Sequence, residues 1–476
     1  MSAADTLPTL PPTYSSDLDI LGIPAFASDL PAYSLGRTSA PVARSGARSL
    51  EKKEFHHELK KKGTPFATLT IVSEAPYSKT LPTFLEGMPI VGKVRLSLDK
   101  PELIQSVIVS VIGQVITGAN QGEQLTFINI LRTLWSQTEG EPRNTNPDNE
   151  DSSLAGTPEA TGSSPKYTGK LQGEYTWHFS IPLPKEVVLP LGSRNEPQVF
   201  TPPATFNERH ARASVAYEVS LKLTRGKLRP DQKLAGPFGY IPITRPPPFS
   251  ILRQIAYQEG TAVLGPIIDP DGWFSTDPIN VQVKMFNTRT IKVGCTLFLA
   301  KPLSYTRGSL IPLSLRLESS DQQALDLLSA SKAIVLRLRR RIKNNWESEH
   351  ALDPLSWKDT VEDSQLAVWW PSAEKPDASS IPTRFVNGEL HLRSDVKPSS
   401  AMANFRIEYS VVLFPFDSAG AVILHADPLI HQQVDIVTAF APGPRPRMSA
   451  PPGYESDSAI TAPSTFNISL GSAFVG

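Results

Sequence analysis

The chain has 476 residues, enough for two or three domains of ordinary size, each with its own core. Its 47 lysines and arginines balance 47 aspartates and glutamates, so the net charge is zero. This balance argues against nucleic acid as the main partner, because phosphate binding usually shows as a basic excess. The one cysteine, Cys295, excludes an internal disulfide framework and a multi-cysteine metal site, as expected in a reducing compartment.

Neither a secretory signal nor a membrane span is expected. The N-terminus has no basic region followed by a continuous apolar run. The most apolar run, residues 103–118, contains two glutamines and two serines and predicts a long buried strand. The 45 prolines, roughly twice the average usage, lie mostly between short apolar runs or near the ends of the chain. This distribution favours β-structure with exposed loops.

The first half of the chain reads as a series of strands behind a polar tail. Residues 1–50 are rich in Pro, Ser, Ala and Thr, so we expect them to be disordered. Residues 138–169 have the same character and predict a disordered insertion. Apolar alternation predicts strands within 66–75, 88–99, 103–116, 124–135, 173–184 and 213–226. In the last of these, one face carries Val215, Tyr217, Val219, Leu221 and Leu223.

A second series of strands follows a linker predicted at 258–275. Alternation predicts these strands within 280–287, 294–301, 309–319, 333–342, 405–416 and 432–440, with a helical turn or two at 321–330. Residues 344–400 predict a long irregular insertion, and 441–476 a second disordered tail. The fold class is therefore all-β, with two β-sandwich domains at 51–257 and 276–440, and sandwiches are favoured over barrels.

Both tails carry a Pro-Pro-x-Tyr motif, at residues 11–14 and 451–454. Two adjacent prolines favour the polyproline II conformation, which lowers the ordering entropy of binding to the aromatic groove of a WW domain. The tyrosine, one turn on, can fill a neighbouring pocket. Residues 30–33 form the weaker Leu-Pro-x-Tyr variant. The alternative is that proline-rich tails produce such strings by chance.

The layout and several phrases of the sequence resemble the fungal α-arrestins, the arrestin-related trafficking adaptors. Residues 82–98, followed by 103–118, are similar to that family's early pattern of a glycine-containing strand before a strand that ends in a glycine-marked turn. Residues 173–184 and 201–226 are similar to its later pattern of an apolar strand, a proline-rich turn with Phe, and a Tyr-containing strand. The resemblance covers residues 55–257 well and 276–440 loosely.

This resemblance implies two arrestin-like, immunoglobulin-like sandwiches that act as an adaptor without a cofactor. They would engage plasma-membrane or endosomal cargo, to which the cytoplasmic protein is recruited peripherally. The tail motifs would recruit a HECT-type ubiquitin ligase through its WW domains, so that cargo is ubiquitylated and sorted for endocytosis. The alternative is an arrestin-fold trafficking scaffold that recruits no ligase. The WW-binding residues would be Pro11, Pro12, Tyr14, Pro451, Pro452 and Tyr454, with Leu30, Pro31 and Tyr33 as a weaker site.

A basic stretch precedes the first predicted strand and has two interpretations. Its lysines are candidate ubiquitin acceptors or contacts for anionic lipid. The favoured alternative is a solvated strand edge whose charges discourage aggregation. The lysines concerned are Lys52, Lys53, Lys60, Lys61 and Lys62.

Two further charged features suggest contacts with phosphate. In residues 335–343, Leu336 and Leu338 are expected to face the core, and Arg337 and Arg339 to face water as the favoured interpretation. The alternative is that this basic strand meets phosphorylated cargo tails or lipid headgroups. Ser449 follows two arginines and precedes the last Pro-Tyr motif, so it is a candidate site for a kinase that prefers basic residues. The buried charge cluster that visual-type arrestins use as a phosphate sensor has no match in the sequence.

Catalytic signatures are absent from the sequence. It contains no G-x-S-x-G elbow, no phosphate-binding G-x-x-x-x-G-K-[ST] loop and no H-E-x-x-H zinc motif. Cys295 lies in an alternating apolar run and is expected to be a small core residue. We therefore expect a binding protein; the rival interpretation, an enzyme on a β-sandwich, requires a deep pocket with converging polar groups.

Overall fold

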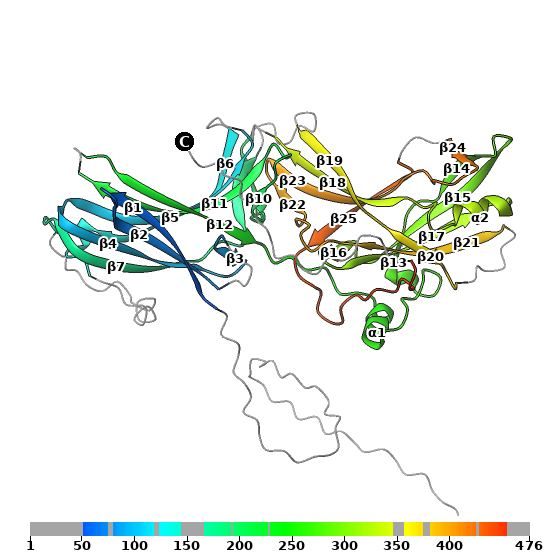
Figure 1. Cartoon of the computed structure of the whole chain (residues 1–476), viewed down its shortest axis with the longest axis horizontal. Coiled ribbons are helices and arrows are strands. Elements are labelled where there is room, and N and C mark those ends of the chain that lie inside the picture. The colour runs from blue at the N-terminus through cyan, green and yellow to red at the C-terminus, as the bar shows by residue number, and fades with distance from the viewer. Residues whose placement is uncertain are drawn as a thin grey trace, which may run out of the picture. The chain divides into compact units, whose positions relative to one another are not determined.

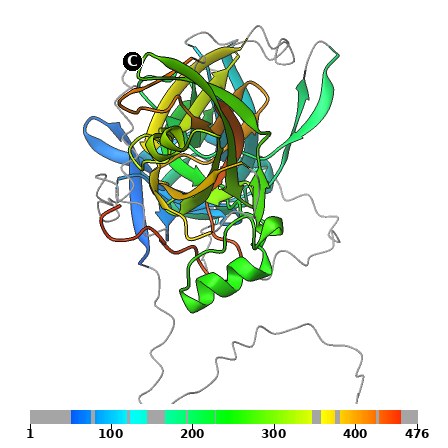
Figure 2. The same ribbon diagram turned by 90° about the vertical axis from the view of Figure 1, so that its right-hand side faces the viewer.

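The structure, a computed structural model, consists almost entirely of β-strands, as the sequence predicts (Figures 1 and 2). It describes residues 51–454 apart from 75–79, 119–122, 144–165, 192–193, 227–228, 346–356, 375–380 and 425–427.

Strands from residues 53–241 form one pair of sheets. A four-stranded sheet has the order β1-β2-β4-β7, and a second sheet follows the order β3-β12-β11-β5-β6, with β10 beside β11 and a separate β8-β9 hairpin. The strands are β1 (Lys53–Lys61), β2 (Thr64–Ser73), β3 (Thr83–Leu85), β4 (Ile90–Glu102), β5 (Ile104–Ile116), β6 (Gln124–Ser136), β7 (Leu171–Ile181), β8 (Val187–Leu191), β9 (Glu196–Phe200), β10 (Phe206–Asn207), β11 (Ser214–Arg225) and β12 (Gln232–Ile241).

Strands from residues 273–437 form a second pair of sheets. One sheet has the order β20-β21-β17-β15-β14-β24 with β13 beside β15, and the other has the order β16-β25-β23-β18-β19 with β22 beside β23. The strands are β13 (Trp273–Ser275), β14 (Ile279–Met285), β15 (Arg289–Ala300), β16 (Ser304–Thr306), β17 (Leu310–Glu318), β18 (Leu336–Asn344), β19 (Lys358–Leu366), β20 (Val368–Pro371), β21 (Thr383–His391), β22 (Ser400–Met402), β23 (Phe405–Leu413), β24 (Ala421–Ile423) and β25 (Ile430–Val437).

Strand β11 shows why the alternating sequence folds in this way. It pairs with β5 on one side and β12 on the other, so only its two faces remain for side chains. The five apolar residues that the alternation assigns to one face, from Val215 to Leu223, are all at most 2% exposed. Tyr217 completes this buried face by donating its hydroxyl to the Pro203 carbonyl at 2.6 Å, and burial raises its pKa. The predicted half-buried strand is confirmed.

Cys295 lies on β15 and is fully buried. Its neighbours in the same core cluster include Leu297 and Leu317. Burial raises the pKa of the thiol to about 12, so the sulfur stays protonated and apolar at neutral pH. The expectation of a small core residue is confirmed.

Two short α-helices interrupt the strands in the described residues, together with single 3₁₀ turns at η2 (Gln137–Glu139) and η4 (Pro270–Gly272). Helix α2 (Gln322–Leu328) matches the predicted helical turns and begins where Asp321 caps the amide of Ala324 at 3.1 Å. Helix α1 (Ile251–Glu259) was not expected from the sequence. Ser250 caps its N-terminus and Gly260 caps its C-terminus, where a φ of 74° is the left-handed conformation that glycine adopts readily.

Three predicted irregular segments differ from the structure. The insertion expected at 344–400 contains the strands β19, β20 and β21, and the expected linker at 258–275 contains η4 and β13. In the tail expected at 441–476, residues 441–454 have a described course. The ends of the insertion expected at 138–169 are also described, and Tyr167 packs edge-on against Trp135 with ring centroids 6.1 Å apart.

The described residues between 51 and 454 belong to one compact unit, so the two pairs of sheets are not separated into independent bodies. Contacts between the pairs include the rings of Phe206 and Phe405, whose centroids lie 5.2 Å apart. Thr244 and Thr438 also exchange hydrogen bonds, with the Thr244 amide donating to the Thr438 hydroxyl at 2.9 Å. Neither described helix is long and apolar enough to cross a membrane.

Gly92 provides a test of packing within the first pair of sheets. A Cβ atom there would lie 2.3 Å from the backbone oxygen of Thr70 and 2.5 Å from the ring of Phe179. We expect Gly92→Ala to lower the free energy of unfolding by about 1–3 kcal/mol, as overpacking does. The matched control is Gly294→Ala, because a Cβ there makes its nearest contact at an ordinary 3.4 Å. Urea unfolding measures both variants, and equal losses would contradict the packing assignment.

Candidate functional site

The C-terminal Pro-Tyr motif forms a turn on the surface. The amide of Tyr454 donates to the carbonyl of Pro451 at 3.1 Å, and Gly453 has a φ of 94°. Proline at the second position and glycine at the third are the residues that a type II turn favours. Pro452, Gly453 and Tyr454 are exposed, whereas Pro451 is half-buried. The motif is therefore on the surface, with its central residues folded back rather than extended.

Ser449, the candidate phosphorylation site, is anchored by its backbone. Its amide donates to Oε1 of Glu389 at 2.6 Å, and the other oxygen of this carboxylate lies 3.1 Å from Nε2 of His391. Glu389 belongs to β21 and is 2% exposed. A buried carboxylate is stable only where donors surround it, so the Ser449 amide contributes to holding this charge in place.

The other Pro-Tyr motifs lie outside the described residues. These are the motif of Pro11, Pro12 and Tyr14 and the weaker variant of Leu30, Pro31 and Tyr33. Both remain predictions from the sequence.

The five candidate acceptor lysines lie on or beside β1, which is the edge strand of its sheet. All five residues are exposed, which agrees with the expected solvated strand edge. Several are engaged in ion pairs: Lys52 with Glu74 at 3.2 Å, Lys60 with Glu58 at 3.3 Å and Lys61 with Glu102 at 2.5 Å.

Glu102 joins the end of β4 to two cations. Its carboxylate is shared between Lys61 and the guanidinium of Arg225, which lies at 2.8 Å. Burial alone would raise the pKa of Glu102, but the hydrogen bond from Lys61 and the charge of Arg225 outweigh it, so the pKa is lowered. Lys61 is therefore held to the sheet, unlike an acceptor lysine on a free tail.

The basic strand β18 is neutralised by the strand beside it. Leu336 and Leu338 are fully buried, as predicted. Three of its arginines pair with carboxylates of β19, which runs beside β18 along its length, and their side chains remain 17–37% exposed to water. The ion pairs between the two strands are Arg339–Asp363, with nitrogen–oxygen distances of 2.7 and 2.9 Å, Arg340–Glu362 at 2.6 Å and Arg341–Asp359.

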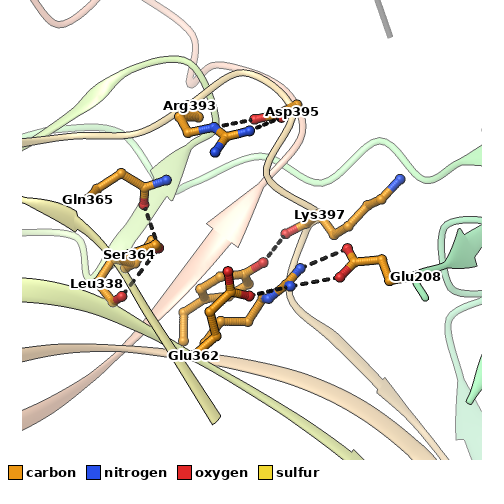
Figure 3. Close-up of polar contacts among 10 residues, drawn as sticks. Glu208, Leu338, Glu362, Ser364, Gln365, Arg393, Asp395 and Lys397 are labelled. Atoms are coloured by element: carbon orange, nitrogen blue, oxygen red, sulfur yellow. Dashed lines mark hydrogen bonds and ion pairs between the residues drawn. The ribbon is translucent and has the colours of Figure 1, made fainter. Parts of the chain in front are cut away.

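Arg340 also connects the two pairs of sheets. Its guanidinium donates to both oxygens of Glu208, which follows β10, at 2.8 and 2.7 Å (Figure 3). Burial opposes the charge on Arg340, but the hydrogen bonds to Glu208 outweigh that effect and raise its pKa. Bidentate pairing of this kind is the strongest form of arginine–carboxylate contact.

Lys397 and Tyr409 complete the surroundings of this ion pair. The Tyr409 hydroxyl donates to the Lys397 carbonyl at 2.7 Å (Figure 3). Burial lowers the pKa of the Lys397 ammonium, and the neighbouring charges of Arg307 and Arg340 lower it further. Glu208 therefore lies beside two cationic side chains, those of Arg340 and Lys397.

The position of Arg340 in the alternating pattern of β18 is a signal in the sequence that our predictions did not use. Leu336, Leu338 and Ile342 point inward at every second position, and Arg340 occupies the inward position between them. An arginine at a core position requires an opposite charge from another element. No local pattern marks Glu208 as that partner, since it lies 132 residues away in sequence.

The described residues contain no group of three or more His, Cys, Asp or Glu side chains placed to hold a metal ion. A cavity between α1 and the second pair of sheets is lined mainly by apolar and hydroxyl side chains, including Phe249, Tyr257, Tyr305 and Leu310, and Pro446 of the C-terminal segment forms part of its wall.

Comparisons with known proteins assign this chain to no family. No protein-family model matches it, and no curated protein is significantly similar in sequence.

The contact between Glu208 and Arg340 predicts a contribution to stability. We expect Glu208→Gln to lower the free energy of unfolding by about 1–3 kcal/mol, because the partly buried guanidinium of Arg340 loses a charged acceptor. The control is Asp395→Asn at the exposed pair with Arg393, where the change should stay below about 0.5 kcal/mol. Chemical denaturation compares the two variants. A Glu208→Gln protein as stable as the parent would show that the pair is energetically neutral.

The lowered pKa of Glu102 predicts a specific dependence on acid. Below its ordinary pKa of 4.5 the unfolded state takes up a proton while the folded carboxylate stays ionised, so stability falls as the pH decreases. Glu102→Gln should reduce stability at neutral pH and make its decline below pH 4.5 shallower, and Lys61→Met should have an intermediate effect. Urea midpoints measured across this pH range provide the test. A slope unchanged in both variants would refute the assignment.

Proposed function

We propose that this protein is an arrestin-like adaptor that links membrane-protein cargo to a HECT-type ubiquitin ligase. The observation that carries the proposal is the pair of Pro-Pro-x-Tyr motifs near the two ends of an all-β chain. The exposure of Pro452 and Tyr454 supports it, because a WW domain must reach both the proline and the tyrosine.

The β-sheets are the proposed cargo-binding part. The phrases that resemble the α-arrestins fall on β3, β4 and β5 and on β7 and β10–β11, so the resemblance follows folded strands rather than loops alone. In this proposal the protein acts in the cytoplasm, is recruited by cargo to the plasma membrane or endosomes, and promotes endocytic sorting. The exposed lysines beside and along β1 are proposed acceptors when the adaptor itself is ubiquitylated.

Linked binding is central to the proposal. A single WW-binding peptide binds weakly, but two motifs on one chain bind a ligase with several WW domains more tightly through effective concentration. Either motif alone should retain part of the interaction. Ligase recruitment is therefore expected to disappear only when both motifs are removed.

The tyrosines of the two motifs provide the test. Tyr14→Ala and Tyr454→Ala should each weaken capture of a ligase with several WW domains by about ten- to a hundredfold, and the double variant should abolish it. Tyr33→Ala is the matched control, because Tyr33 belongs to the weaker motif and its loss should have little effect. The measurement is affinity capture from cells, with ligase and membrane proteins quantified together.

The same experiment separates the two candidate functions. Capture of ligase that is unchanged in the double variant would contradict the proposal. Capture of membrane proteins that persists without any ligase, in the parent as well as the variant, would favour a trafficking scaffold instead.

A further inference from the structure

The segment after β25 follows a defined path along α1. The amide of Ala439 donates to the Thr244 carbonyl at 2.9 Å, and Nη1 of Arg245 donates to the Phe440 carbonyl at 3.1 Å. These contacts fix the start of the segment beside the chain that leads into α1. In Figure 1 the segment, drawn in red, passes close to this helix.

Three further residues of the segment contact α1 or its surroundings. A Cβ atom on Gly443 would lie 3.5 Å from Oε1 of Gln254, and one on Gly260 would lie 2.7 Å from Nη1 of Arg447. Pro446 lies between these points in the cavity formed with Phe249 and Tyr257. Arg447 thus lies at the C-terminal end of α1, where the helix dipole favours a positive charge.

The path ends at the buried carboxylate of Glu389. Ser449 donates its amide to this carboxylate at 2.6 Å, and only Ala450 separates Ser449 from the Pro-Tyr motif. The anchor therefore determines where the motif lies. Immediately beyond it, the hydrogen bond from Tyr454 to Pro451 closes the turn in which Gly453 has a φ of 94°.

This turn is incompatible with the conformation that WW domains bind. Polyproline II has a φ near −75° at each residue, and its extended form presents successive side chains to an aromatic groove. Gly453, between the prolines and the tyrosine, has a φ of the opposite sign. The docked motif must unfold its turn before its prolines and tyrosine can enter a WW domain together.

We propose that α1 and β21 form an intramolecular docking site for residues 443–454, and that docking competes with WW-domain binding to the C-terminal motif. The WW part of this inference rests on the proposed function, whereas the docking does not. The occupant is a segment of the same chain, and its release exposes a binding motif. The apparent association constant of the intact chain for a WW domain is then the intrinsic constant multiplied by the fraction of molecules in which the segment is undocked.

Phosphorylation of Ser449 keeps the segment undocked in this mechanism. A protein kinase would transfer the γ-phosphoryl group of ATP to Oγ of Ser449 in the undocked segment, releasing ADP and the hydroxyl proton. The phosphate adds a charge of about −1.5 to −2 to the residue whose backbone amide holds the Glu389 carboxylate. Because like charges repel in a buried site, the modified segment cannot dock again, and the motif stays available.

The first experiment compares the intact chain with its own tail. In a chain carrying Tyr14→Ala and Tyr33→Ala, the C-terminal motif is the one left to bind an isolated WW domain of a HECT-type ligase. We expect this chain to bind about tenfold more weakly than a synthetic peptide of residues 443–476. Ser449→Pro removes the anchoring amide and should restore most of the difference. Ser449→Ala keeps the amide and should not.

The rate of trypsin cleavage measures docking independently of WW binding. Cleavage between Arg447 and Met448 should be slow in the parent and in Ser449→Ala, and about tenfold faster in Ser449→Pro, since the protease needs an undocked segment. The peptide with Ser449→Pro corrects for any direct effect of the added proline on WW affinity.

The outcomes distinguish this inference from the proposed function. Equal affinities of chain and peptide, with fast cleavage in all proteins, would overturn the docking site and leave the ligase proposal standing. A peptide that binds no WW domain would overturn the ligase proposal, while slow cleavage that Ser449→Pro accelerates would still support the docking site.

The release step has its own matched pair of variants. Ser449→Glu adds a negative charge beside Glu389, and Ser449→Gln adds a side chain of similar size without charge. We expect cleavage at Arg447 and WW affinity to rise in Ser449→Glu relative to Ser449→Gln, and to rise further with phosphoserine incorporated at this position. Equal rates in all three proteins would overturn the release by charge.

Discussion

The pairing of Arg340 is the interaction around which the two pairs of sheets meet. A guanidinium in an inward position of a strand must be neutralised, because leaving its charge buried without a partner is costly. Glu208 from the first pair and Glu362 on β19 supply that neutralisation. Phe206, whose ring contacts that of Phe405, lies two residues before Glu208, so one short stretch at β10 in the first pair of sheets brings both an aromatic ring and a charge to the junction.

Strands with a buried apolar face could be predicted from the sequence, whereas a strand that serves mainly to pair charges could not. Strands such as β11 bury one face completely, and their apolar alternation is visible in a single chain. Strand β19 is an edge strand with charged residues on both faces, whose carboxylates match the arginines of β18. Its sequence has no apolar period, so the segment appeared irregular. Helix α1 was missed because Arg253 is buried while Ile251 is 75% exposed, the reverse of the usual pattern.

Some features of the candidate sites depend only on neighbouring residues in the sequence, and others depend on residues far away in the chain. A Pro-Pro-x-Tyr motif is a local pattern, and so is a serine that follows arginines; both are visible in the sequence. The docked path of residues 443–449 depends on Glu389, which lies 60 positions from Ser449 in the chain. No single-sequence pattern connects two such residues. A tail that composition marks as disordered can therefore have a specific place on the folded surface.

The burial of Cys295 makes the protein a convenient subject for thiol chemistry. The thiolate is the reactive form of cysteine, and the one native thiol is both inaccessible and protonated at neutral pH. A cysteine introduced at an exposed position such as Met448 becomes the one thiol that a maleimide dye can reach in the folded chain. Fluorescent or spin labels can then report on a chosen segment while the native core remains unmodified.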